Sequence, residues 1–325
     1  MPTMPRLRSL SVLLALGLLA SGGASAQDNY PSKPIQLISS QGVGGGVDAL
    51  LRAIGQGLSE RTGHGFTVDA RPGANGLLAT NACANAKPDG YTVCLVNTQF
   101  VLLPFLQTKP TYDPIKDFEP VTHIVTASLA LAVQKNVPAR TLPELIAYSK
   151  ANPGKLNYIS LGAANPVDLG IELLMRQHGV DWKAIPYRGA ADSTLAFHSG
   201  DVQLMFITSL NVMAAVANGS GTMLFVTGNK RLPKSPVPTL AETGFPNAAI
   251  GGIWFALIAP PGTPKPLREK LAREIAEVLK RPDVLIRAEE TGYELVGNTP
   301  DQFGAFLVKE RSQAGPLLAG KQKIN

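Results

Sequence analysis

The stretch that decides the fold reads Ser39-Ser-Gln-Gly-Val-Gly-Gly-Gly-Val-Asp48. It follows the apolar run 35–38 and precedes an amphipathic run from Leu50 to Leu58, an order that predicts a strand, a glycine loop and a helix. Glycines let the loop backbone approach a ligand closely, and a helix start, here capped by Asp48, favours an anion. We therefore expect an anion-binding loop, with a mere tight turn as the alternative.

The chain around this loop alternates between strand and helix patterns. Strands are predicted at 66–69 and 91–96 and a helix at 77–86, which gives a β-α-β-α-β order and predicts a parallel sheet. Ligands of such sheets bind beyond the carboxyl ends of the strands. We expect three loops at that edge: 39–47, 71–76 and 97–100.

A second unit of the same kind follows later in the chain. A predicted strand at 156–160 leads through the small-residue loop 161–168 into a predicted helix. Two long apolar strands, 124–133 and 250–259, are predicted where the chain crosses between units. We therefore predict two α/β lobes with a cleft between them: 28–126 plus 251–325, and 127–250.

The N-terminus has the pattern of a secretory signal peptide. Arg6 and Arg8 precede the apolar run 10–20, and Ala24-Ser-Ala26 is a small-residue cleavage motif. We expect cleavage after Ala26 and export of a soluble protein. Because Arg6 and Arg8 are the only charged residues before Gln27, cleavage lowers the formal net charge from +6 to +4. This diffuse excess suits small anionic ligands and does not indicate nucleic-acid binding.

The sequence offers no catalytic or metal-binding spacing. The four histidines are dispersed, and no nucleophile–base pair or clustered carboxylates can be placed in the predicted cleft. We expect no metal and no cofactor. A dinucleotide fingerprint at Gly42-x-Gly44, with Asp69 as the ribose contact, is disfavoured because Val47 holds the place of the third glycine.

Cys83 and Cys94 flank a predicted turn. After export they can form a disulfide, and two buried thiols are the alternative.

Many short motifs, colinear over nearly all of the chain after Ala26, resemble one family: the extracytoplasmic solute receptors of the tripartite tricarboxylate transporter system, also called Bug receptors. The matching stretches are Tyr30-Pro-Ser-Lys-Pro-Ile35, Gly44-Gly-x-x-Asp48, Arg71-Pro-Gly-Ala74, Pro88-Asp-Gly-Tyr91, Tyr112-Asp-Pro-x-Lys-Asp-Phe-x-Pro-Val121, Asn152-Pro-Gly-Lys-Leu-Asn-Tyr158, Pro186-Tyr-Arg-Gly189, Val202-x-Leu-Met-Phe206, Trp254-Phe, Ala259-Pro-x-Gly-Thr-Pro264 and Gly297-x-Thr-Pro300.

The resemblance implies a two-lobed α/β periplasmic binding protein fold (type II), each lobe a mixed, mostly parallel sheet flanked by helices. Such receptors hold a small organic carboxylate in the interlobe cleft, through loop N–H groups and ordered water, and deliver it to a membrane permease. We expect a periplasmic monomer of this kind. A periplasmic solute sensor for a signalling partner, and less favoured an exported enzyme, are the alternatives.

The chain departs from the family pattern at several loop positions. Ser40 to Val43 replace a proline-rich lead-in, and Ile207 stands where relatives often carry an Asp that suits an amino group. We therefore favour a mono- or dicarboxylate without an amino group, aromatic acids included, whose uncharged part faces Ile207. Asp168 is expected to turn inward as a helix cap, and Arg188 to bind the carboxylate or to form a salt bridge across the lobes.

The residues that we expect at the solute site lie in these loops and at nearby strand ends. They are Ser40, Gln41, Gly44, Gly45, Asp48, Ala74, Asn75, Gly76, Thr98, Gln99, Ser160, Gly162, Ala163, Asn165, Val167, Arg188, Ile207 and Thr208.

Overall fold

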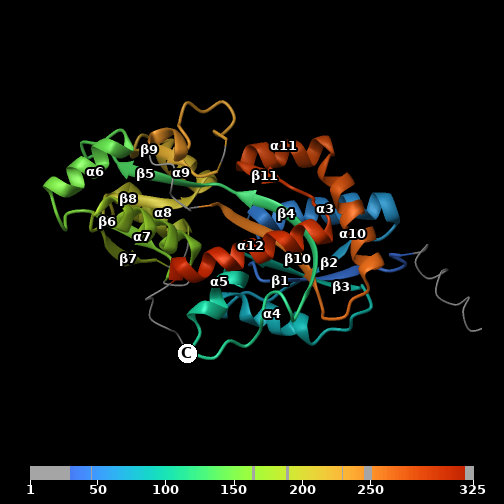
Figure 1. Ribbon diagram of the computed structural model, residues 1–325. Helices are drawn as coiled ribbons and strands as arrows, with labels where there is room; N and C mark the ends of the chain where they lie inside the picture. Colours follow the sequence, from blue (N-terminus) through green and yellow to red (C-terminus); the bar gives the residue numbers. More distant parts are fainter. Residues whose placement is uncertain are drawn as a thin grey trace, which may run out of the picture.

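The computed structural model describes residues 30–44, 46–162, 165–187, 190–228, 230–244 and 251–318. A six-stranded and a five-stranded sheet, each flanked by helices, lie side by side along the long axis of the molecule (Figure 1). The predicted signal peptide at 1–26 lies outside the described residues.

The six-stranded sheet has its strands in the order β11-β4-β10-β3-β1-β2. β1 is parallel to β2 and to β3, so the predicted β-α-β-α-β unit forms a parallel sheet. β10 is antiparallel to β3 and β4, and β11 is antiparallel to β4. The strands are β1 (Ile35–Ser39), β2 (Phe66–Ala70), β3 (Thr92–Asn97), β4 (Glu119–Ala127), β10 (Ile253–Ala259) and β11 (Tyr293–Leu295).

The five-stranded sheet has the order β7-β6-β8-β5-β9. β6 is parallel to β7 and β8, whereas β5 is antiparallel to both of its neighbours. Each sheet is therefore mixed, with most of its strands pointing one way. The strands are β5 (Leu129–Gln134), β6 (Asn157–Ser160), β7 (Lys183–Pro186), β8 (Leu204–Thr208) and β9 (Gly221–Val226).

The chain crosses between the sheets at the end of β4 and again between β9 and β10. The prediction of a single strand at 124–133 is wrong. This segment forms parts of two strands in different sheets, which are separated by Ser128. The Ser128 carbonyl accepts a hydrogen bond from the Ser209 N–H at 2.8 Å. An unbroken apolar run does not reveal which sheet each half joins. The strands of the two sheets come from 35–127 with 253–295, and from 129–226. The domain boundaries that we give above stay a prediction.

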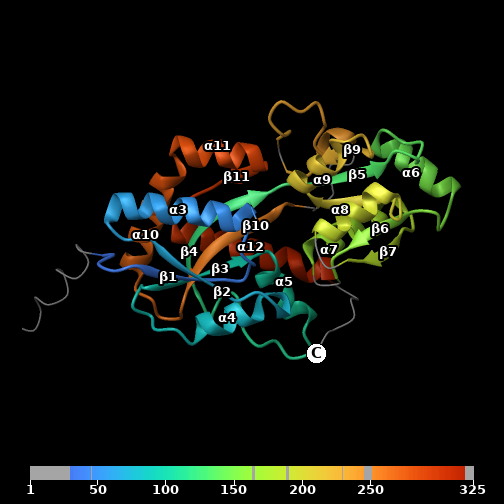
Figure 2. The same ribbon diagram turned by 180° about the vertical axis from the view of Figure 1, so that it is seen from behind.

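Helices cover both faces of the six-stranded sheet (Figure 2). On one face, apolar residues of α3 at helical spacing pack with α10 and α11; on the other, α4, α5 and α12 pack together. α5 and β11 are elements that the sequence reasoning did not find, because α5 is apolar on all sides and β11 is very short. The bounds are α3 (Gly46–Thr62), α4 (Leu77–Ala84), α5 (Gln99–Leu106), α10 (Lys265–Leu279), α11 (Pro282–Thr291) and α12 (Pro300–Leu318).

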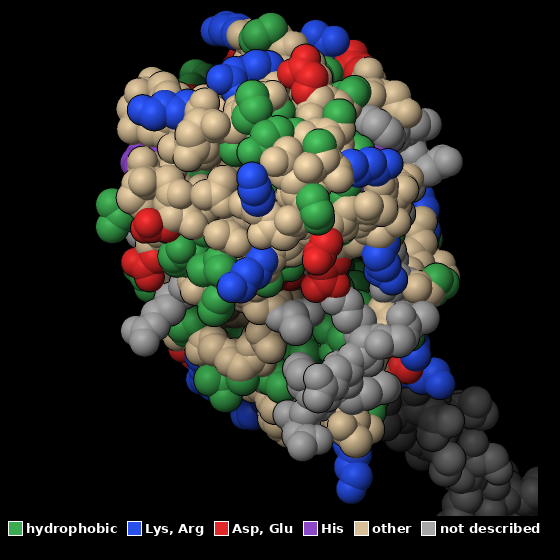
Figure 3. All heavy atoms as spheres, turned by 90° about the vertical axis from the view of Figure 1, so that its left-hand side faces the viewer, with side chains coloured by type: hydrophobic (Ala, Val, Ile, Leu, Met, Phe, Trp, Pro, Cys, Tyr) green, Lys and Arg blue, Asp and Glu red, His purple; other side chains and the backbone are tan. Residues whose placement is uncertain are grey.

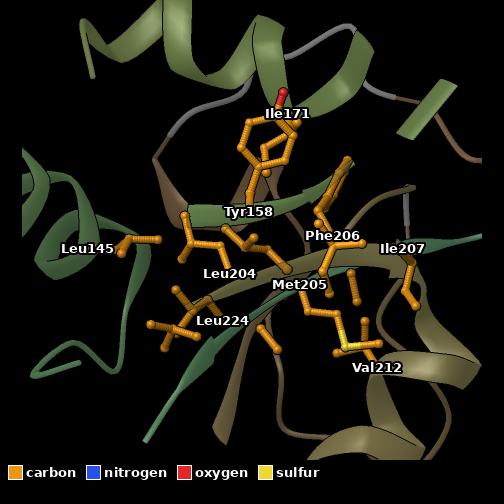
Figure 4. Packing of buried hydrophobic residues seen from close by; sticks show 14 of the residues in the cluster. Leu145, Tyr158, Ile171, Leu204, Met205, Phe206, Ile207, Val212 and Leu224 are labelled. Atoms are coloured by element: carbon orange, nitrogen blue, oxygen red, sulfur yellow. The ribbon is translucent and has the colours of Figure 1, made fainter. Parts of the chain in front are cut away.

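The second lobe is built around one large hydrophobic cluster, part of which is shown in Figure 4. Thr141 caps α6 by accepting a hydrogen bond from the Glu144 N–H. The helices of this lobe are α6 (Leu142–Ala151), α7 (Pro166–His178), α8 (Ala190–Ser199) and α9 (Ser209–Val216). On the end of the molecule that carries α6, Lys and Arg are interspersed with Asp and Glu (Figure 3).

Two further contacts join elements of the molecule. Cys83 of α4 and Cys94 of β3 form a disulfide, the first of the two alternatives for this pair. Leu169 of α7 is buried in the same cluster as Leu102, Trp254 and Ala314, so the start of α7 packs on the first lobe.

Candidate functional site

The first candidate loop joins β1 to α3 and is fixed by side chains at both of its ends. The Ser39 hydroxyl accepts from the Gln41 N–H at 3.1 Å, and the Asp48 carboxylate accepts from the Gly44 N–H at 3.0 Å. Gly44 has φ +89° and open space around it, and Gly42 and Val43 are also exposed. Residues 42–44 therefore present exposed backbone between these two hydrogen bonds.

Asp48 supports this loop and is largely covered. Arg52, one turn further along α3, donates to it through Nε at 3.0 Å. The hydrogen bond from Gly44 and the Arg52 guanidinium keep the pKa of the Asp48 carboxyl below its ordinary value. With both oxygens engaged by its own loop and helix, Asp48 is a clamp on the loop in this arrangement.

The second candidate loop joins β6 to α7 and repeats this wiring. The Ser160 hydroxyl accepts from the Gly162 N–H at 3.2 Å, and Asp168 accepts from the Leu161 N–H at 2.7 Å. The inward orientation expected for Asp168 is thus confirmed, but its expected role as the cap of α7 is wrong, because that cap is Asn165. Asn165 caps α7 by accepting from the Val167 N–H at 3.0 Å, and Val167 itself is buried. Gly162 is exposed with φ +109°.

The turn 71–76 lies against the first loop. The Arg71 N–H donates to the Ser39 carbonyl at 2.8 Å, and a Cβ on Gly76 would lie 3.7 Å from the Ser40 Cβ. Gly73, Ala74, Asn75 and Gly76 all have positive φ. For Ala74 and Asn75 this conformation is strained, and such strain is common at binding sites. The turn includes the short helix η1 (Ala74–Gly76).

The Arg71 side chain pairs with Asp69 at 2.8 Å and so does not face the first loop as a free cation.

The strand-end residues occupy different positions relative to these loops. Thr98 holds β10 through a 3.1 Å hydrogen bond from the Trp254 N–H to its hydroxyl, and Thr208 accepts from the Asn211 amide at 2.7 Å. The Gln99 N–H donates to the Asn97 side chain at 2.9 Å. Thr98 also lines a cavity of about 550 Å³ that lies between α5, α7 and α12. Among the described residues that line this cavity, Thr98 alone belongs to the predicted site.

Ile207 does not lie on an accessible surface. It is 2% exposed and points from β8 toward Val212 of α9, on the same side as Met205 (Figure 4). The Ile207 side chain is therefore covered in this arrangement and does not contact a solute in it. The expected contact stays a prediction. Gly45, Ala163 and Arg188 lie outside the described residues.

The structure thus brings together Ser40, Gln41, Gly44 and the turn 74–76 in one lobe, and Ser160, Gly162 and Asn165 in the other. Both groups lie at the carboxyl ends of strands, where ligands of α/β sheets bind. Sequence reasoning missed the role of Asp48 and Asp168 in holding the loops. Nothing in the sequence indicated that the Tyr293 hydroxyl lies beside Gly46.

Two similar lobes with matched loops define the molecule as a two-lobed solute-binding protein. The model of the tripartite tricarboxylate transporter family receptor matches residues 50–322, and the chain belongs to that family. The resemblance in the sequence is thereby confirmed. No helix in the described ranges is both long and apolar enough to cross a membrane.

Individual relatives match over most of their length. A UPF0065 protein of Bordetella pertussis is 32% identical over 94% of this chain and 95% of its own. R. palustris Rpa4515, solved with adipate, is 29% identical with a TM-score of 0.79, over 89% of this chain and 97% of its own. MatC from Rhodopseudomonas palustris, solved with bound malate, is 26% identical with a TM-score of 0.76, over 89% of this chain and 100% of its own.

Proposed function

We propose that this protein captures a small organic carboxylate between its two lobes and delivers it to a tripartite tricarboxylate-type membrane permease. The observation that carries the proposal is the matched wiring of the two loops. In each, a serine at the strand end and an aspartate in the first helical turn hold exposed backbone beside a helix start. Two such anion-favouring sites on opposite lobes suit a carboxylate.

The class of solute follows from the relatives and from the charges at the site. The two related structures solved with adipate and malate both hold dicarboxylates. Arg52 and Arg71 are each paired with a carboxylate of their own lobe. The proposed contacts are therefore loop N–H groups and hydroxyls, with Arg188 as the cation that the sequence places in a loop. We favour mono- and dicarboxylates, aromatic acids included, over amino acids.

A thermal-shift panel tests the proposal. The protein after Ala26 is mixed with aliphatic and aromatic mono-, di- and tricarboxylates and with amino acids. A solute at about 100 times its dissociation constant should stabilise the protein by about 2.7 kcal/mol. No stabilisation by any carboxylate contradicts the proposal, and a response to amino acids alone contradicts the solute class.

Two further measurements address delivery and catalysis. Deleting the receptor in its host should abolish high-affinity uptake of the stabilising acid, and a supply of the permease alone should not restore it. Incubating the acid with the receptor and recovering it unchanged by mass spectrometry supports a binding protein. Conversion of the acid would instead indicate an enzyme.

A further inference from the structure

Tyr293 lies at the edge of the first sheet that faces the second lobe. It is the first residue of β11 and pairs with Ala127, the last residue of β4 before the chain crosses between the sheets. Its ring packs, partly buried, against the cluster that contains Val47 of α3. The residue is therefore close both to the crossing and to the first candidate loop.

The Tyr293 hydroxyl contacts the start of α3. A Cβ added to Gly46, the first residue of α3, would lie 2.6 Å from this oxygen and 3.4 Å from the Tyr293 Cζ. An ordinary side chain at position 46 would therefore displace the hydroxyl. Glycine at the end of the loop makes room for the phenol.

The residue before it contacts the other lobe. Gly292 has φ +66°, and a Cβ there would lie 3.0 Å from the Ser209 Oγ and 3.2 Å from the Leu232 Cδ2. Ser209 begins α9 and directly follows Thr208, a predicted site residue. The segment 292–293 thus lies between the first turn of α3 and the first turn of α9.

The chemistry of the phenol fits this position. Burial raises the pKa of Tyr293, so the hydroxyl stays protonated at neutral pH and can donate a hydrogen bond. Hydrogen bonds to a charged acceptor are stronger than neutral ones, and a carboxylate is such an acceptor.

We propose that Tyr293 is a further solute-binding residue whose hydroxyl donates a hydrogen bond to the bound carboxylate beside the start of α3. This inference rests on the proposed function. No sequence pattern indicated it, because Tyr293 and Gly46 are far apart in the chain and β11 is too short to be recognised.

The first test is Tyr293→Phe, which removes the hydroxyl and keeps the ring. Tyr148→Phe is the matched control, because Tyr148 is a partly buried tyrosine on α6, at the far end of the second lobe. Calorimetric titration uses the carboxylate that stabilises the wild type most. We expect the dissociation constant to rise about tenfold or more in Tyr293→Phe and to stay unchanged in Tyr148→Phe.

A second test probes the contact without a solute. Gly46→Ala should lower the unfolding midpoint in the wild type and lower it less in Tyr293→Phe, where the crowded oxygen is gone. If the two substitutions lower the unfolding midpoint additively, the contact between the Tyr293 hydroxyl and α3 is overturned.

The outcomes separate this inference from the proposed function. If the wild type binds no carboxylate of the panel, both fall. If the wild type binds a carboxylate and Tyr293→Phe binds it equally well, the role of Tyr293 alone is overturned. A lower unfolding midpoint for Tyr293→Phe with unchanged affinity also overturns it, because that pattern indicates packing.

Discussion

The carboxylate of Asp168 accepts a hydrogen bond from the backbone N–H of Leu161 at 2.7 Å, and so ties the first turn of α7 to the loop that precedes it. Asp48 ties α3 to Gly44 in the same way in the other lobe. Both carboxylates are buried and turned toward their own loops, so each holds backbone in place and is itself covered. They are positioning residues of the proposed site.

Asp168→Ala should destabilise the protein and weaken solute binding. Hydrogen bonds to charged groups contribute about 1.5–3 kcal/mol, so we expect a loss of about 2 kcal/mol in the free energy of unfolding by urea. Asp192→Ala is the control, because Asp192 is the third residue of α8 as Asp168 is of α7, but is exposed. Equal stability of the two variants would show that the Asp168 clamp has no role in holding the loop.

Gly44→Ala should weaken solute binding more than it weakens the fold. A left-handed conformation costs a non-glycine residue roughly 1–2 kcal/mol, and the same cost applies to Gly154→Ala. Gly154 is also exposed, with φ +72° and open space around it, but lies in a turn after α6. We expect similar unfolding midpoints for the two variants and a raised dissociation constant in Gly44→Ala alone. Identical affinities would remove the first loop from the site.

Removing the disulfide should lower stability by about 3 kcal/mol, because the bond closes a loop with a sequence separation of 11. The double variant Cys83→Ala with Cys94→Ala tests this by urea unfolding. Adding a reductant should destabilise the wild type and leave the double variant unchanged. If the reductant destabilised the wild type and the double variant equally, the loss of stability would not come from this disulfide.

His123 should make stability depend on pH between about 6.5 and 4. Burial lowers the pKa of His123 to about 4, below the ordinary value of about 6.5 that it regains on unfolding. Between these two pH values the unfolded state binds more protons than the folded state. The stability that neutral His123 contributes is therefore fully present above pH 6.5. It is lost as the pH falls toward 4, which lowers the free energy of unfolding by up to about 3 kcal/mol. Urea unfolding of the wild type and of His123→Gln at pH 7 and pH 4.5 measures it. Equal losses in both proteins would contradict the assignment to His123.

The order of strands and helices could largely be predicted because it depends on local patterns. Short stretches show the glycine loop after β1 and the helical spacing of Leu50, Leu51, Ile54 and Leu58. The break at Ser128 was not visible, because β4 and β5 are both apolar and separate only in the tertiary structure. β11 was missed because three residues carry no periodicity.

The sequence was enough to predict which loops form the candidate site. It was not enough to predict which residues contact one another there. Glycines and helix starts indicated where backbone would be exposed, but the partners of Asp48 and Asp168 depend on how each loop folds back on its helix. The burial of Ile207 depends on α9 packing against β8, which no motif records. The contact of Tyr293 with α3 joins opposite ends of the chain.

The most direct test of the central claim compares an acid with its carboxamide. The acid that stabilises the receptor most and the amide of the same carbon skeleton are titrated into the wild type by calorimetry. If N–H groups of both loops bind a carboxylate, the amide should bind at least tenfold more weakly, a difference of about 1.4 kcal/mol or more. Equal dissociation constants for the two would contradict carboxylate recognition by this cleft.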